Sequence, residues 1–320
     1  MELFGDQKDV GLLLHPGAAS FDRKTKTYTL SASGENMWAA KDAFHFLYTQ
    51  GRGDLAISAD ISFVGNGTDK HRKACLMFRQ DLEPDSAYID VALHGDGLTS
   101  LQFRETKGAL THEIQANLIA PHHFRLEKRG PSIYLHLESR FSGASHRMTL
   151  QDPFYVGLAV CSHNKDVTET ARFSNVVIET KLPSTQPTPY ITLETQSIAS
   201  TDRRTVFVTK ELIESPAWTL DGTSLLFTLA DQRYVISAIV PGSTPQKTSI
   251  SAVGIVPSLT SPDQKRTLSI TPSSDATINS LRLSETTLLA NLTAAPGLSH
   301  QPCWSPDSKK IAFISYHAVP

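Results

Sequence analysis

The chain has 320 residues, enough for two domains, and 40% of them are hydrophobic, an ordinary share for a globular protein. Its 30 basic and 32 acidic side chains give a net charge of −2, which argues against a nucleic-acid partner and against binding to an anionic membrane. No apolar run approaches the ~18 residues of a membrane helix, and no signal peptide is visible at the start, so the chain as it stands is expected in the cytoplasm.

The first 180 residues predict β-strands and no helix. Apolar and polar residues alternate over a series of short segments, which is the pattern of strands with one buried face. These segments are 55–63, 73–79, 88–94, 99–104, 124–128, 133–137, 154–161 and 173–178. Gly95-Asp96-Gly97 supplies a tight turn between two of them, because glycine tolerates positive φ. Many short strands of this kind predict a two-sheet sandwich.

Three of these strands have an unusually polar face. If the strands are neighbours, the polar side chains that alternate with the apolar ones line one surface: Lys73, Arg79, Asp90, His94, Gln102 and Arg104. One interpretation is a solvated outer face with cross-strand ion pairs. The other is a polar groove that hydrogen-bonds a ligand such as a sugar, with Trp38 or Tyr88 stacking on its apolar face. Catalysis is the least favoured interpretation, because a glycosidase needs two carboxyl groups flanking one bond.

Several segments of this half resemble a bacterial concanavalin A-like domain. They are Gly34–Trp38, Asp42–Phe46, Lys73–Arg79, Ala87–Gly97, Leu101–Arg104, Val156–His163 and Ala171–Val176. The same sandwich family is similar to modules appended to glycoside hydrolases and to laminin-G-like lectins. The resemblance covers about residues 5–182 and implies a jelly-roll sandwich with a carbohydrate or protein ligand. It implies no catalytic residue.

A linker is expected after this domain. Three of the nine residues from Lys181 to Pro189 are prolines, which suppress helix and sheet pairing and favour an extended chain. The predicted organisation is therefore a sandwich over 1–182, a linker over 183–189, and a second β-domain over 190–320.

The second half contains one short motif three times. The copies are Ser215–Gly222, Ser261–Lys265 and Gln301–Ser308, and their aspartates at 221, 263 and 307 are 42 and 44 residues apart. A period of about 40–45 residues built from short strands is typical of propeller blades. The motif resembles the Pro-x-Trp-Ser-Pro-Asp-Gly element of TolB-type propellers, which implies that Trp218 and Trp304 pack between blades.

About three blades fit into 190–320, and three blades do not close a ring. We expect a truncated propeller; pairing with another copy, an open array of blades, or strands that complete the sandwich are the alternatives. Because an open blade edge leaves backbone groups unpaired, self-association through such edges is a further expectation.

No motif for catalysis or cofactor binding is present. The sequence lacks a phosphate loop, a dinucleotide-binding glycine run, His-Glu-x-x-His and Gly-x-Ser-x-Gly. Cys75, Cys161 and Cys303 lack metal spacing and are expected to be buried thiols. We therefore expect no cofactor, no metal and no catalytic residue.

Three functions remain open. The favoured one is a non-catalytic protein that binds a carbohydrate or a protein through the polar face of the sandwich and the propeller surface. The second is a glycan-active enzyme, with the sandwich as its accessory region and its catalytic blades missing from this chain. The third is a structural scaffold whose polar face is merely solvated.

Overall fold

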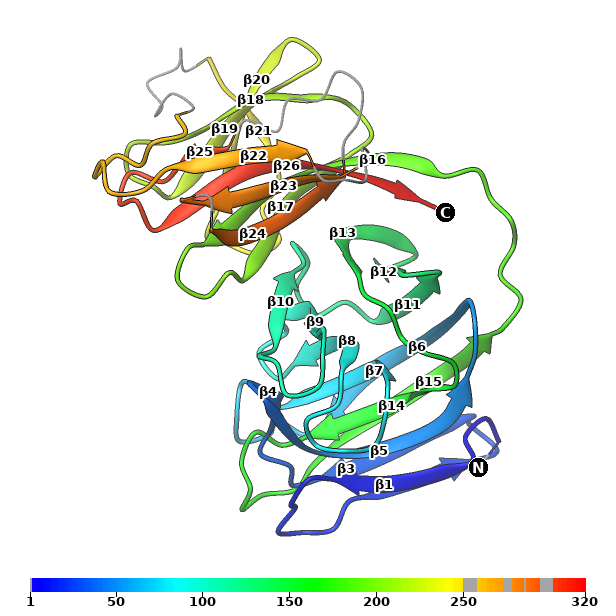
Figure 1. Cartoon of the computed structure of the whole chain (residues 1–320). Helices are drawn as coiled ribbons and strands as arrows, with labels where there is room; N and C mark the ends of the chain where they lie inside the picture. Colours follow the sequence, from blue (N-terminus) through cyan, green and yellow to red (C-terminus); the bar gives the residue numbers. More distant parts are fainter. Residues whose placement is uncertain (1, 250–257, 273–277, 285, 294–301) are drawn as a thin grey trace. The chain divides into compact units, whose positions relative to one another are not determined.

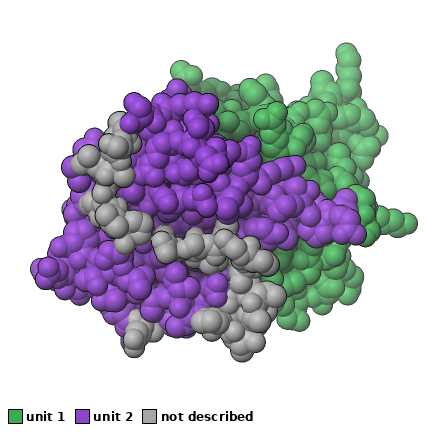
Figure 2. Space-filling model, turned by 90° about the horizontal axis from the view of Figure 1, so that it is seen from above, with its two compact units in different colours: residues 1–184 green, residues 185–320 purple. Residues whose placement is uncertain are grey.

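The computed structural model describes residues 2–249, 258–272, 278–284, 286–293 and 302–320 (Figure 1). The chain divides into two compact units, Met1–Ser184 and Thr185–Pro320, which Figure 2 colours separately. All regular elements among the described residues are β-strands. Within these ranges there is accordingly no helix that could span a membrane.

The amino-terminal unit consists of two antiparallel sheets. In the first, the strand order is β1 (Asp6–Val10), β5 (Lys41–Gly51), β14 (Phe154–Cys161), β7 (Lys73–Arg79), β8 (Tyr88–His94), β9 (Thr99–Arg104) and β10 (His112–Gln115); the short β4 (Asn36–Trp38) pairs with the start of β5. In the second, it is β13 (Arg140–Arg147), β12 (Ser132–Leu137), β11 (His123–Arg129), β6 (Leu55–Val64), β15 (Glu169–Glu179), β3 (Thr27–Ala32) and β2 (Ala18–Asp22).

The core of this unit lies between the two sheets. Leu76 and Val91 of the first sheet and Ile57, Leu126 and Phe173 of the second are fully buried in one cluster. Successive side chains of a strand point to opposite faces, so the alternation seen in the sequence delivers one apolar face per sheet. Burying each large apolar side chain contributes about 1.5–3 kcal/mol. The amino-terminal half is therefore the two-sheet sandwich that the sequence predicts.

The opposite face of the first sheet is polar, and it is also covered. The strand registers place Lys73 opposite His94, and Asp90 opposite Gln102. The segment 36–42 and the loop 80–87 lie over part of this face and are joined by a backbone hydrogen bond from Asp42 N–H to Pro84 O (2.9 Å). Part of the predicted polar surface thus becomes a second interior.

The described residues of the carboxyl-terminal unit form three antiparallel sheets. The first has the order β17 (Arg203–Thr209), β16 (Thr188–Ser197), β26 (Lys310–Val319) and β25 (Cys303–Trp304). The second contains β18 (Ile213–Trp218), β19 (Ser224–Leu229), β20 (Gln232–Ser237) and β21 (Gln246–Lys247), and the third contains β22 (Leu268–Pro272), β23 (Ile278–Leu283) and β24 (Thr287–Thr293). β16 already begins within the segment where the sequence predicts a linker.

A closed propeller is not observed among the described residues of this unit. Strand β16, at the start of the unit, pairs with β26 over ten positions, from Thr188–Val319 to Ser197–Lys310. Phe313 of β26 packs in one cluster with β22–β24, whereas its neighbours Ala312 and Ile314 pack in another with β18–β20. Since alternate side chains face opposite ways, the β16–β26 sheet has the other two sheets on its two faces. The sheets therefore pack face to face, and among the described residues they do not close into a ring.

The three sequence motifs nevertheless form the same turn. The aspartate Oδ1 accepts a hydrogen bond from the hydroxyl two residues before it, at 2.6 Å for Asp221, 2.5 Å for Asp263 and 2.6 Å for Asp307. It also accepts the backbone N–H two residues after it, at 3.0–3.1 Å. The intervening residue has positive φ, which suits Gly222 and is also adopted by Gln264 and Ser308. The three motifs therefore form equivalent turns, although the sheets beside them contain different numbers of strands.

Candidate ligand-binding pocket

A pocket of about 280 Å³ opens on the polar face of the first sheet of the sandwich. Its lining comes from β4, β7, β8, β9 and β10, and from the segments that precede β7 and follow β14. The lining residues are Asn36, Trp38, His71, Lys73, His94, Leu98, Gln102, Glu113, Gln115 and His163. A wider hollow over Phe21, Arg23 and Lys26 holds none of the buried polar side chains of the sheet, so we place the candidate site at the smaller pocket.

Lys73 anchors the floor of this pocket. Its ammonium group donates to Asn36 Oδ1 (2.9 Å), Met37 O (3.0 Å) and Gln102 Oε1 (3.1 Å). A lysine has three N–H donors, so all of them are used inside the protein. The Nζ atom also lies 5.2 Å from the centroid of the Trp38 ring, within cation–π range. Lys73 thus ties β4 to the sheet and holds the indole in place.

The lysine also fixes the orientation of its neighbours. Because Lys73 can only donate, the Gln102 oxygen must face it, and the Gln102 amide nitrogen then points to Ser100 Oγ and to His94 Nε2, both at 3.3 Å. His94 Nε2 therefore accepts, and its proton sits on Nδ1. Burial, together with the charge of Lys73, lowers the pKa of His94 well below its usual value. The imidazole is uncharged at neutral pH.

The rim of the pocket carries polar groups that the sequence analysis missed. Glu113 and Gln115 of β10 stand opposite Gln102 and Ser100 of β9, and Gln115 Nε2 donates to Glu113 Oε1 (2.7 Å). Both are half-buried. Their alternation around the buried Ile114 was the available signal, but a four-residue strand is too short for that pattern to stand out. Asn36, His71 and His163 were missed because they belong to β4 and to loops, where periodicity gives no information.

The loop that carries His71 is held by Arg72. Its guanidinium donates to Glu169 Oε2 (2.6 Å) and to Gly65 O (3.0 Å), while Thr68 N–H donates to Glu169 Oε1 (2.8 Å). This buried pair fixes one wall of the pocket. Over the described ranges, no three histidine, cysteine, aspartate or glutamate side chains are placed to hold a metal ion.

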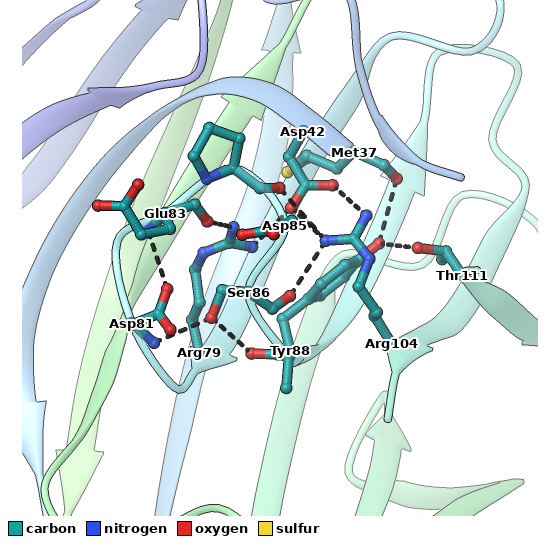
Figure 3. A network of polar contacts seen from close by, with 12 residues as sticks. Met37, Asp42, Arg79, Asp81, Glu83, Asp85, Ser86, Tyr88, Arg104 and Thr111 are labelled. Carbon is teal, nitrogen blue, oxygen red and sulfur yellow. Dashed lines mark hydrogen bonds and ion pairs between the residues drawn. The ribbon is translucent and has the colours of Figure 1, made fainter. Parts of the chain in front are cut away.

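Arg79 and Arg104 do not line the pocket, because both are paired with Asp42 beneath the covering segments (Figure 3). Asp42 Oδ2 accepts from Arg79 Nη1 (2.7 Å) and Arg104 Nη1 (2.8 Å), and Oδ1 accepts from Arg104 Nη2 (2.7 Å). Further guanidinium N–H groups donate to the carbonyl oxygens of Glu83 and Ser86 in the loop 80–87. All three side chains are fully buried. They hold the loop 80–87 and the segment 36–42 on the sheet.

Tyr88 also belongs to this interior. Its hydroxyl donates to Met37 O (3.2 Å), and its ring lies 5.6 Å from the guanidinium of Arg79 and 5.0 Å from that of Arg104. The sequence placed Arg79, Arg104 and Tyr88 on the correct face of the sheet. Strand parity carries no information about the segments that cover that face, so their burial could not be predicted.

Asp90 is the fourth predicted residue that does not line the pocket. It is fully buried, and within the described part of the chain its carboxyl oxygens have no hydrogen-bond partner. Burial raises its pKa from 3.8 to about 8, and the charge of Lys73 only partly opposes this. Asp90 is therefore a neutral acid at neutral pH. Of the eight predicted residues, Trp38, Lys73, His94 and Gln102 line the pocket.

Replacing Asp90 with Asn is expected to stabilise the sandwich, increasingly so as the pH rises. The native state binds the Asp90 proton more tightly than the unfolded state does, so this group lowers the free energy of unfolding as the pH rises from about 4 to about 8. We expect Asp90→Asn to gain on the order of 5 kcal/mol near pH 9 and nothing near pH 4, since the amide also lacks partners. Urea unfolding at both pH values, with the exposed Asp166→Asn as control, measures this. A gain of the same size at both pH values contradicts it.

Comparisons with known proteins show similarity to solved structures only. No family model matches the sequence, and no curated protein matches it. A functionally unknown protein from Saccharomyces cerevisiae is 15% identical, with a TM-score of 0.43, over 53% of this chain and 96% of that chain. The carbohydrate-binding module CBM66 from Bacillus subtilis is 18% identical, with a TM-score of 0.39, over 55% of this chain and 96% of that chain. A Bacillus licheniformis beta-glucanase is 12% identical, with a TM-score of 0.35, over 55% of this chain and 92% of that chain. At these identities and TM-scores the similarities say nothing about the function of this chain.

Proposed function

We propose that the amino-terminal unit is a non-catalytic, concanavalin A-like carbohydrate-binding module whose ligand occupies the pocket beside Trp38. The observation that carries this proposal is the combination of an aromatic wall with a preoriented polar floor, Lys73–Gln102–His94. A sugar ring has hydroxyl groups at its edge and an apolar face, so it needs planar hydrogen-bonding groups and a flat apolar surface together. The volume of about 280 Å³ is at the lower end for ligand pockets and suits one sugar unit.

Recognition fits the lining better than catalysis does. Glycoside hydrolysis uses two carboxyl groups on either side of the scissile bond. Among the lining residues that the structure describes, Glu113 is the single carboxylate. Asp90 lies on the same face of the sheet, but it is fully buried and does not reach the pocket. Catalysis at this pocket is therefore the weaker hypothesis.

For the carboxyl-terminal unit we propose an origin in propeller-type repeats. The three equivalent turns support it, and so do the two tryptophans, each of which donates to a backbone carbonyl in or beside another motif. Trp218 Nε1–H donates to Cys303 O (3.1 Å), and Trp304 Nε1–H donates to Leu259 O (3.2 Å). The middle motif has no tryptophan, so the corresponding third contact is not made in this way. We also propose that this unit takes part in protein recognition or self-association.

Replacing Trp38 with Ala is expected to weaken glycan binding at least about tenfold, because an aromatic contact contributes about 0.5–1.5 kcal/mol beyond the area it buries. The full-length protein is first screened on a glycan array, and the affinity for the best ligand is then measured by calorimetry. Trp38→Phe is the matched control, and it should retain most of the affinity because it keeps an aromatic face. If the wild type binds no glycan, the proposed function is wrong. If Trp38→Ala binds as tightly as wild type, the ligand lies elsewhere.

A further inference from the structure

Among the described lining residues, Lys73 is the one lysine or arginine, and its charge is not free to meet a ligand. Lys73 is 2% exposed, and its three N–H groups are all donated to Asn36, Met37 and Gln102. To bind a ligand anion directly, the lysine would have to give up one of these bonds. His94 adds no positive charge, since burial and Lys73 keep it neutral.

The negative charge at the rim, by contrast, is available to a ligand. Glu113 is half-buried, and Gln115, a neutral amide, is the partner of its Oε1. No cation forms an ion pair with Glu113 within the ranges that the structure describes. The carboxylate therefore keeps unused acceptor capacity at the pocket mouth, and two neighbouring sugar hydroxyls can fill it. Hydrogen bonds to an ionised acceptor are about twice as strong as those between neutral groups.

From these two observations we propose that the pocket selects electrically neutral sugars and rejects uronates and sulfated sugars, with Glu113 as the specificity-determining residue. The inference rests on the proposed carbohydrate-binding function. A ligand anion at the rim would face Glu113 at short range, and a like-charge contact of this kind costs several kcal/mol. The Asn36 amide completes the arrangement: its oxygen is held by Lys73, so its NH₂ group remains to donate to a ligand oxygen.

The test uses matched sugars that differ only in a hydroxymethyl or a carboxylate group at one carbon. Binding of the full-length protein is measured by calorimetry at about pH 7.5, above the ordinary titration range of histidine. We expect wild type to bind the neutral member at least tenfold more tightly than the uronate. Glu113→Gln should lose affinity for the neutral sugar and reduce the preference to about threefold or less. The Glu105→Gln control, whose residue is outside the pocket, should behave as wild type.

The possible outcomes separate the two proposals. If no sugar binds wild type, the carbohydrate-binding function itself fails. If a sugar binds and Trp38→Ala abolishes the binding, but the uronate is preferred or the preference is unchanged in Glu113→Gln, the function stands and the charge selection is wrong. Salt gives a second readout: any residual uronate binding by wild type should tighten as salt screens the repulsion, and it should not do so in Glu113→Gln. Uronate binding by wild type that weakens with salt overturns the inference.

Discussion

Asp42→Asn is expected to lower the free energy of unfolding of the amino-terminal unit by about 3–5 kcal/mol. Asp42 is the shared counter-charge of Arg79 and Arg104, and all three side chains are fully buried. The amide would leave two guanidinium groups without an anion in an interior where neither can reach water. Removing one partner of a buried ion pair costs more than the pair itself contributes, because the remaining charge stays desolvated.

The effect is measured by urea unfolding combined with hydrogen exchange of the strands β7, β8 and β9. Asp85→Asn is the matched control, since Asp85 pairs with Lys107 at 3.2 Å but both side chains are partly exposed. An exposed pair contributes about 0–1 kcal/mol, so this variant should resemble wild type. Equal losses for the two variants would contradict the role of Asp42. Protection should fall first in β7 and β9, from which the two arginines project, if the triad holds the covering segments on the sheet.

The second large effect is expected in the carboxyl-terminal unit, where Glu194 is fully buried. Burial by itself would raise the pKa of Glu194, but Arg203, His317 and Thr192 together lower it from 4.5 to about 2. The Arg203 guanidinium donates to Oε2 (2.8 Å from Nε), and the Thr192 hydroxyl donates to Oε1 (2.7 Å). A lowered native pKa stabilises the fold above about pH 4.5, and this contribution is lost as the pH falls towards about 2.

Glu194→Gln should therefore cost about 3 kcal/mol at neutral pH and progressively less below about pH 4. The fluorescence of Trp218 and Trp304, both buried in this unit, reports its unfolding. The exposed Glu211→Gln is the control, and it should be neutral at every pH. A cost that does not change between neutral and acidic conditions would show that the carboxylate charge is not what stabilises this sheet.

The sequence carries enough information for the sandwich strands and for their faces. The alternation over 73–79, 88–94 and 99–104 placed the polar set on one face, and the observed registers put Lys73 opposite His94 and Asp90 opposite Gln102. It also carries the three turns of the second half, because a hydroxyl residue, an aspartate and a residue tolerant of positive φ form them locally. Pleat and turn geometry depend on neighbours in the sequence, and so they can be predicted from it.

Only the tertiary structure decided which part of the polar face is covered and which part stays open. The segment 36–42 and the loop 80–87 cover one end, where Arg79 and Arg104 meet Asp42, and leave the other end open around Trp38 and Lys73. These are contacts between residues tens of positions apart, and no local period encodes them. The same holds for β16 and β26, whose pairing across more than 100 residues joins the two ends of the second unit, which the repeat spacing could not indicate. Local geometry fixes which way a side chain points, but what lies above it is decided by parts of the chain that only folding brings there.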